Sequence, residues 1–189
     1  MNRDEMLSRL AERSAVWDVL IIGGGATGLG CALDAATRGY RALLVEKGDF
    51  GQATSSRSTK LIHGGVRYLQ QGNIKLVRES LRERGLLLRN APDLVHELPF
   101  IVPAYKWWEP AFYGTGLKLY DLLAGKYRLR RSEFVSSVEV ARRLPGINGD
   151  GLRGGMLYYD AQFDDARLAI ALARTAVTRG AAILNYAQV

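Results

Sequence analysis

Short apolar runs and one small-residue segment organise the start of the chain. Residues 17–22, WDVLII, form a short, mostly apolar run that predicts a buried parallel strand, and residues 40–47, YRALLVEK, predict a second strand. Segment 26–38 between them is rich in alanine, suits a helix packed closely on a sheet, and ends at Gly39. This order predicts a βαβ unit with a right-handed crossover, and so an α/β fold.

The hydrophobic period changes further along the chain. Residues 74–90 carry apolar side chains at helical spacing, with arginine and glutamate elsewhere, and Pro92 marks the end of this predicted helix. Segment 98–135 then interleaves aromatic and basic residues and holds three of the five prolines, so it predicts an excursion away from the first sheet. The last part predicts a helix over 136–147 capped by Ser136 or Ser137, a strand over 151–160, a helix from Asp164 or Asp165 to Gly180, and a strand over 181–189.

Composition narrows the class of protein. Of the 189 residues, 48% are apolar and 24% are charged, which is ordinary for a globular domain, and no apolar run is long enough to predict a membrane-spanning helix. The single cysteine, Cys31, excludes a disulfide framework and favours a reducing compartment, and its place in an apolar helix predicts a buried thiol. A net charge of +7 favours anionic partners such as phosphate groups.

The two ends of the chain allow predictions about a surface helix and about the extent of the protein. Residues 1–15 mix charges, lack the apolar core of a secretory signal, and contain acidic residues that argue against a transit peptide, so we expect a surface helix there. The strand over 181–189 is followed by no further element that could cover it. We therefore expect the chain to be the N-terminal part of a longer protein.

The strongest chemical signal is G-x-G-x-x-G at Gly23, Gly25 and Gly28, with Glu46 at the end of the following strand. Gly23 allows a tight turn, Gly25 lets a pyrophosphate approach the backbone, and Gly28 lets helix and strand pack closely. The helix start then offers N–H groups and a positive dipole end to the phosphate. Glu46 is placed to accept from a ribose hydroxyl and disfavours a 2′-phosphate, so the pattern predicts an NAD or FAD site and leaves the choice open.

A hydroxyl-rich loop follows the second predicted strand at residues 53–60. A flavin cofactor extends past the pyrophosphate and needs a further polar cradle, which this loop could supply. A solvated linker explains the composition equally well.

Four motifs in order resemble the flavin-dependent glycerol-3-phosphate dehydrogenases, and look closest to their mitochondrial-type branch. They are IIGGGATGLGCALDAATRG, TSSRSTKLIHGGVRYL, YKWWEPAFYGTGLKLYDLLAG and YYDAQFDDARLAIALARTA, and the resemblance runs from about Val16 to Val189. The N-terminus without a transit-like leader suggests a bacterial relative. The resemblance implies FAD held in a Rossmann-like domain of the D-amino-acid-oxidase-like type, with part of an α+β substrate or cap domain. It also implies oxidation of sn-glycerol 3-phosphate to dihydroxyacetone phosphate, with hydride transfer to the flavin and electrons passed to a membrane quinone.

The same resemblance implies roles for individual residues. Arg67 matches the arginine that helps to hold the substrate phosphate, as a fixed and always charged donor fork would, with Tyr68 beside it. His63 either accepts the proton of the C2 hydroxyl or packs against the flavin without titrating. The residues expected to hold FAD are Gly23, Gly25, Ala26, Thr27, Gly28, Glu46, Lys47, Thr54, Ser55, Lys60, Leu61, His63 and Val189.

The expected domain division follows from these assignments. Residues 16–91 would form the first part of the FAD-binding domain, 92–160 the substrate or cap excursion, and 161–189 the return to the FAD-binding domain. Segment 105–131 has the aromatic and basic composition of a membrane interface, so we expect a cytoplasmic protein with a peripheral contact on the cytoplasmic face of the inner membrane. A homodimer is one option for its assembly.

The same residues bear on other partners and functions. No recognised nucleic-acid-binding motif is present, so we expect no nucleic-acid partner. Asp160, Asp164 and Asp165 suit a helix start better than a metal site, and the sequence has no cluster of His and Cys ligands, so we predict no metal. A glycerol-3-phosphate oxidase that uses oxygen, and a truncated FAD-binding module without activity, remain alternatives.

Overall fold

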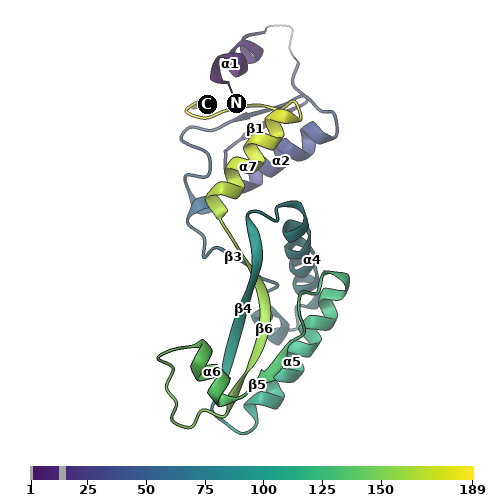
Figure 1. Ribbon diagram of the computed structural model, residues 1–189. Coiled ribbons are helices and arrows are strands. Elements are labelled where there is room, and N and C mark those ends of the chain that lie inside the picture. The colour runs from purple at the N-terminus through teal and green to yellow at the C-terminus, as the bar shows by residue number, and fades with distance from the viewer. Residues whose placement is uncertain (1, 13–15) are drawn as a thin grey trace. The chain divides into compact units, whose positions relative to one another are not determined.

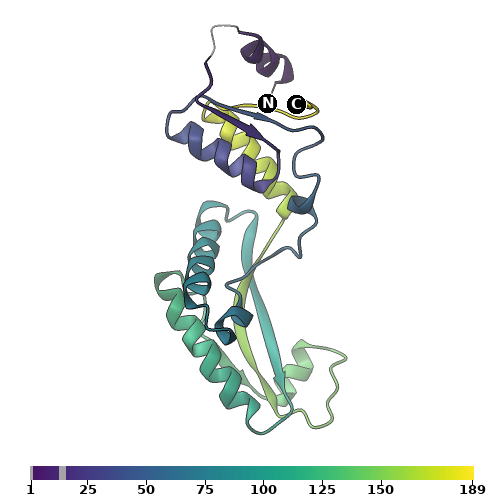
Figure 2. The same cartoon turned by 180° about the vertical axis from the view of Figure 1, so that it is seen from behind.

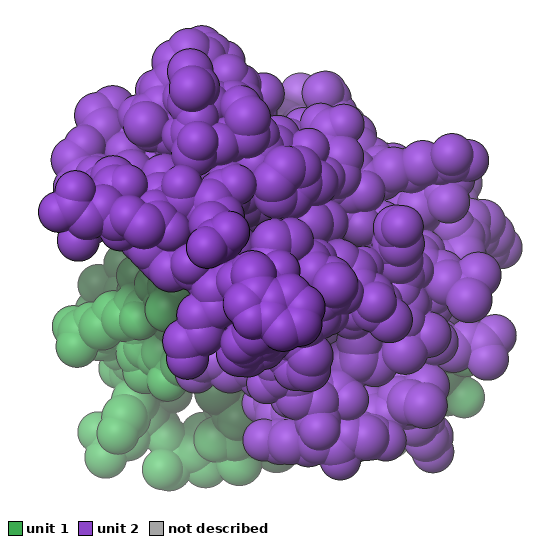
Figure 3. Space-filling model, turned by 90° about the horizontal axis from the view of Figure 1, so that it is seen from below, with its two compact units in different colours: residues 1–60, 164–189 green, residues 61–163 purple. Residues whose placement is uncertain are grey.

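The computed structural model describes residues 2–12 and 16–189. They form two compact units, residues 1–60 with 164–189 and residues 61–163, which Figure 3 colours separately. No helix within the described residues is long and apolar enough to cross a bilayer.

The first unit is built on a parallel three-stranded sheet in the order β1-β2-β7, with strands Val19–Ile22, Ala42–Val45 and Ala182–Leu184. Helices α2, Ala26–Thr37, and α7, Asp165–Thr178, lie together on one face of it (Figures 1 and 2). Their contact is lined with alanine, which lets the two helices and the sheet pack closely. Helix α1, Arg3–Ala11, buries Met6 against Leu43 and Leu184 on the other face. The predicted βαβ unit and its α/β class are confirmed.

Burial in this unit corrects two predictions. The run at 17–22 was expected to be buried, but Val19 and Ile21 of β1 are only partly buried, and Leu20 and Ile22 are 57% and 71% exposed. Cys31 is exposed and not buried. Helix α2 buries Leu29 and Ala32, and Cys31 points away from the stripe that these positions form.

The second unit is built on an antiparallel sheet whose central strand is β6, Gly154–Phe163. Strand β4, Val95–Ala104, pairs along one edge of β6, while β3, Leu61–Ile62, and β5, Glu133–Val135, pair along the other. Side chains alternate along β6, so Tyr158 and Asp160 face helix α5 and Leu157 faces the opposite side. The remaining elements of this unit are α3, Val66–Gln70, α4, Ile74–Asn90, α5, Glu109–Ala124, the short turn η2, Gly125–Tyr127, and α6, Ser137–Arg143.

Strand β4 and helix α5 were not predicted from the sequence. Pro99 and Pro103 in β4 argue against a strand, yet β4 is an edge strand that pairs only with β6. The two prolines are four residues apart and so have the same orientation, with the position of the missing N–H turned away from β6. The final strand is shorter than expected, because β7 ends at Leu184.

The boundary between the units differs from the expected division. The second unit begins at Leu61 and not at residue 92, because α3 and α4 pack against α5 around Val77, Leu81 and Tyr120. The helix at 74–90 was predicted with its correct bounds. What the sequence did not indicate is which sheet that helix covers.

Candidate functional site

The glycine turn after β1 has the geometry predicted for it. Gly23 has a φ of +113°, in the region that favours glycine, and its N–H donates to the carbonyl of Val45 at 2.9 Å. A Cβ on Gly28 would overlap the carbonyl oxygen of Gly23, so helix α2 can approach the turn only with glycine at this position. Gly25 is the N-cap of α2 and makes no side-chain cap, and a Cβ there would lie 3.1 Å from Ser55 Oγ.

Glu46 follows β2 and is bound to the glycine turn. Its Oε2 accepts from the N–H of Gly24 at 2.6 Å, and its Oε1 accepts from the N–H of Gly48 at 2.7 Å. The Gly24 hydrogen bond, followed by that of Gly48, lowers the pKa of the Glu46 carboxyl below its ordinary value. The carboxylate is therefore charged and fixed, and each oxygen keeps a lone pair for a further donor such as a ribose hydroxyl.

A cavity of about 390 Å³ lies beside this carboxylate. Of the residues predicted to hold the cofactor, Gly23, Glu46, Lys47 and Val189 line it. The remaining lining residues are Ile22, Val45, Ala187 and Gln188. A cleft at the carboxyl ends of parallel strands, next to a glycine turn and an acid, is where such folds bind the adenosine part of a dinucleotide.

The loop at 53–60 is held to the helices of the same unit. Ser55 Oγ accepts from the N–H of Ala26 at 2.8 Å, so a hydroxyl of this loop caps α2, while Thr54 in the 3₁₀ turn η1, Thr54–Ser56, is exposed. Lys60, with a φ of +58°, pairs through Nζ with Asp165 Oδ1 at 2.5 Å. Lys60 was predicted to line the cofactor, whereas its ammonium is bound to Asp165 in the structure.

Asp165 is the buried partner in this contact. It also accepts from Ser58 Oγ at 2.7 Å, and Lys60 and then Ser58 lower the pKa of its carboxyl. Asp164 caps α7 through the N–H of Arg167, as predicted. The loop is therefore neither a free linker nor an isolated cradle, but a segment fastened to the starts of α2 and α7.

The segment from His63 to Tyr68 forms a second candidate site, in the second unit. Strand β3 ends at Ile62, and Gly65 then takes a left-handed conformation with a φ of +71° that turns the chain into α3. Gly64 is buried, and a Cβ there would lie 2.5 Å from both Leu81 Cδ2 and Tyr120 Oη. Only glycine fits at this close approach.

This turn brings the predicted substrate residues together. His63 and Arg67 are exposed and line one cavity of about 390 Å³, with Leu61 and Tyr68. The other residues that line it are Gly65, Val66, Gln71, Phe100, Tyr158 and Asp160. An arginine and a histidine that share a cavity of this size can bind a small anion and exchange a proton with it.

Sequence reasoning missed a buried polar cluster next to this cavity. Asp160 was assigned to a helix start, but it lies in β6, where it contacts Arg84 of α4 and Tyr120 of α5. The sequence around both Arg84 and Asp160 indicates that a charged side chain is buried there. Arg84 lies on the apolar face of its helix, seven residues after Val77, and Asp160 follows an apolar run in a strand. A charge placed on an apolar face predicts a buried partner.

The residues fit FAD on structural grounds, because Gly23 and Gly25 present bare backbone at the turn, Gly28 allows helix α2 to approach that turn, and Glu46 lines the adjoining cavity. Residues 18–189 match the DAO family of FAD-dependent oxidoreductases. The chain is 50% identical over 185 residues to the mitochondrial glycerol-3-phosphate dehydrogenase of Homo sapiens, covering 94% of this chain and 25% of that protein.

Solved structures give the same result. The glycerol-3-phosphate dehydrogenase from Bacillus halodurans complexed with FAD matches with a TM-score of 0.70 and 32% identity, over 99% of this chain and 29% of that one. The L-α-glycerophosphate oxidase from Mycoplasma pneumoniae, with FAD bound, has the same fold, with a TM-score of 0.64 at 20% identity over 92% of this chain and 45% of that one. The chain spans about a quarter of the length of the curated relatives it matches. It belongs to the DAO family of FAD-dependent oxidoreductases, and FAD is its cofactor.

Proposed function

We propose that the full-length protein oxidises sn-glycerol 3-phosphate to dihydroxyacetone phosphate and passes the electrons to a membrane quinone. The observation that carries this proposal is the single cavity that holds Arg67, Tyr68 and His63. Similarity to glycerol-3-phosphate dehydrogenases across nearly the whole chain supports the same substrate.

The chain's own residues have separable roles in this reaction. Arg67 binds the substrate phosphate through its charged fork, and Tyr68 stands next to it on α3. His63 is the candidate to take the proton of the C2 hydroxyl as hydride leaves C2. When bound, FAD supplies the two-electron acceptor for that hydride. Gly23, Gly25 and Glu46 hold the cofactor and take no part in proton transfer.

The test is anaerobic addition of glycerol 3-phosphate to the purified full-length protein, with the flavin absorbance as readout. We expect a flavin spectrum that the substrate bleaches. Arg67→Ala should raise KM for glycerol 3-phosphate at least tenfold, since a hydrogen bond to a charged group contributes about 1.5–3 kcal/mol, while FAD content stays unchanged. A colourless protein, or a flavin that the substrate leaves oxidised, would overturn the proposal. Peroxide formation in air at the rate seen with a soluble quinone would reassign the protein as an oxidase.

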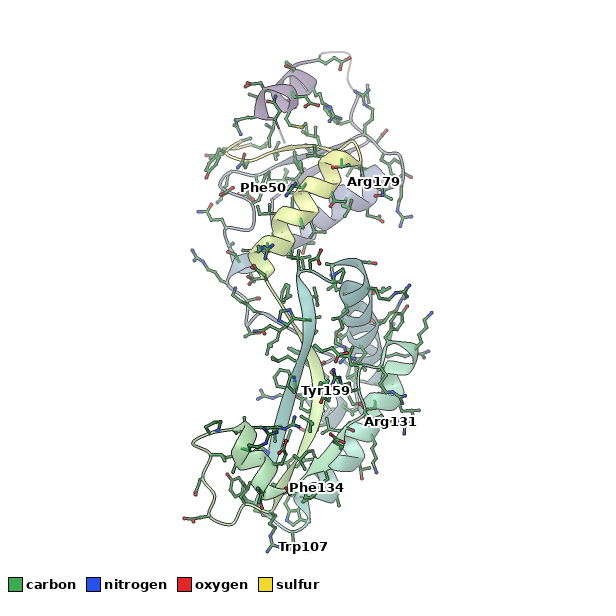
Figure 4. The ribbon with its side chains drawn as sticks, viewed as in Figure 1. Phe50, Trp107, Arg131, Phe134, Tyr159 and Arg179 are labelled. Atoms are coloured by element: carbon green, nitrogen blue, oxygen red, sulfur yellow. The ribbon has the colours of Figure 1, made fainter. Side chains whose placement is uncertain are left out.

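We further infer that segment 105–131 contacts the cytoplasmic face of the inner membrane, from where a quinone is reached. Trp107 is 80% exposed at the end of the second unit, where Figure 4 shows it pointing away from the sheet, and Phe112 and Leu122 are 54% and 73% exposed. Lys106 lies over the ring of Trp108 at 5.6 Å. Exposed aromatic side chains beside cations suit the boundary between headgroups and acyl chains.

Vesicle sedimentation tests this contact. The full-length protein should sediment with vesicles that contain anionic lipid, and the double variant Trp107→Ser, Phe112→Ser should remain in the supernatant. Because both side chains are exposed, the variant should keep its flavin and its thermal stability. Equal sedimentation of the two proteins would place the membrane contact elsewhere.

A further inference from the structure

A buried polar cluster lies behind the turn that carries His63 and Arg67. It consists of Arg84, Tyr120 and Asp160, each 2% exposed. Arg84 Nη1 donates to Asp160 Oδ1 at 2.6 Å, and Tyr120 Oη donates to the two oxygens of the same carboxylate at 2.9 and 3.1 Å. Helices α4 and α5 and strand β6 each contribute one residue (Figure 1), so the cluster joins three elements of the second unit.

The cluster is hydrogen-bonded to the backbone of the turn that carries His63 and Arg67. Tyr120 Oη accepts from the N–H of Gly64 at 2.7 Å, and because the hydroxyl donates to Asp160, its lone pair is directed at this N–H. Asp160 Oδ1 accepts from the same N–H in a longer contact of 3.4 Å. Gly64 immediately follows His63 and lies three residues before Arg67. The shorter of these two contacts, to the buried hydroxyl of Tyr120, therefore is the main one that sets where the turn into α3 begins.

Stability alone does not account for this arrangement. A buried ion pair is often no more stabilising than apolar residues of the same volume. Arg84 Nε is buried and has no hydrogen-bond partner within the part of the chain that the structure describes, which costs stability. Burial raises the pKa of Tyr120, so its hydroxyl stays protonated and keeps donating to Asp160.

We propose that Tyr120, oriented by Asp160 and Arg84, is a positioning residue that fixes the Gly64 turn and thereby places Arg67 for the substrate phosphate. This inference rests on the proposed function for the identity of the ligand. Tyr120 does not line the cavity, so its effect on the substrate passes through the turn.

The test uses Tyr120→Phe in the full-length holoenzyme. The substitution removes one hydroxyl and keeps the ring that packs against Val77 and Leu81. We expect KM for glycerol 3-phosphate to rise about tenfold, the scale of one hydrogen bond, while kcat changes less than about threefold and FAD content stays the same. Tyr113→Phe on the same helix is the matched control, because no hydrogen bond of its hydroxyl is found among the described residues; it should leave KM unchanged.

Two readouts separate positioning from a general loss of structure. In an Arg67→Ala background, Tyr120→Phe should change KM less than about twofold, because the group it positions is gone; full additivity of the two effects would overturn the proposal. Hydrogen exchange of the segment 61–69 should be faster in Tyr120→Phe than in Tyr113→Phe, and equal exchange would also overturn it. If glycerol 3-phosphate does not reduce the wild-type flavin, the proposed function fails, and the exchange experiment still decides whether Tyr120 fixes the turn.

Discussion

Replacing Glu46 with glutamine tests how the cofactor turn is held. The carboxylate accepts from two backbone N–H groups, of Gly24 at 2.6 Å and of Gly48 at 2.7 Å, one on each oxygen. Glutamine has the same shape but only one acceptor oxygen, and its NH₂ group is a donor. In Glu46→Gln, one of the two backbone N–H groups therefore faces another donor.

The magnitude follows from these contacts. A hydrogen bond to a charged group contributes about 1.5–3 kcal/mol, and the partial exposure of Glu46 lets water replace some of it. We expect Glu46→Gln to lose about 2 kcal/mol of the free energy of FAD binding, which corresponds to a dissociation constant about 30-fold higher. Titration of flavin fluorescence measures the dissociation constant. Glu133→Gln, at an exposed position on β5, is the control and should bind FAD as the wild type does.

The pH dependence gives an independent check. The folded-state pKa of Glu46 lies below its ordinary value of 4.5, chiefly because of the Gly24 hydrogen bond. A carboxyl with a lowered folded-state pKa contributes stability that is fully present above its unfolded pKa and is lost as the pH falls through the folded value. The difference in urea midpoint between wild type and Glu46→Gln should be constant at neutral pH and should shrink as the pH falls below about 4.5. A difference that does not change with pH, or equal FAD affinities at neutral pH, would refute this account of the turn.

Two further substitutions test close packing and buried charge. Gly28→Ala should abolish FAD binding, because the added methyl group overlaps the backbone carbonyl of Gly23, which cannot move away. The measurement is the flavin absorbance of the purified variant. A yellow variant with wild-type affinity for FAD would contradict this prediction. Asp160→Asn should lower the free energy of unfolding by about 3–5 kcal/mol, because Arg84 keeps a buried charge without its counter-charge. The double variant Arg84→Met, Asp160→Leu should recover most of that loss in urea unfolding, and a double variant as unstable as Asp160→Asn would show that the cost is not one of unpaired charge.

Elements that depend on local signals could be predicted from the sequence. The glycine turn, the helix at 74–90 and the caps at Ser136 and Asp164 are fixed by residues a few positions apart, and all are found in the structure. Strand β4 could not be predicted in this way. Its two prolines are compatible with a strand only because β6 pairs along a single edge, and β6 begins 50 residues after β4 ends, at Gly154 and Ala104.

The same difference between local and long-range contacts decides which parts of the candidate site could be predicted. His63 and Arg67 are four residues apart within one motif that carries the family resemblance, so that resemblance was enough to predict roles for both, and they line one cavity. The bond between Tyr120 and Asp160 spans 40 positions, and that between Arg84 and Asp160 spans 76. No local pattern specifies such pairs, and the one available signal was a charge on an otherwise apolar face.

The two functional turns are held by the same physical device. In the first unit the carboxylate of Glu46, directly after β2, binds the N–H of Gly24, and in the second the carboxylate of Asp160 in β6 holds the N–H of Gly64 chiefly through the hydroxyl of Tyr120 and by a longer direct contact of 3.4 Å. Both glycines are buried and leave no room for a side chain, so neither turn can be held by side chains of its own. An acid in or directly after a strand holds each turn in place, because strand positions are fixed by a ladder of hydrogen bonds while a glycine-rich turn is not. Substitution of either acid should therefore impair the turn it holds, although neither acid lies within that turn.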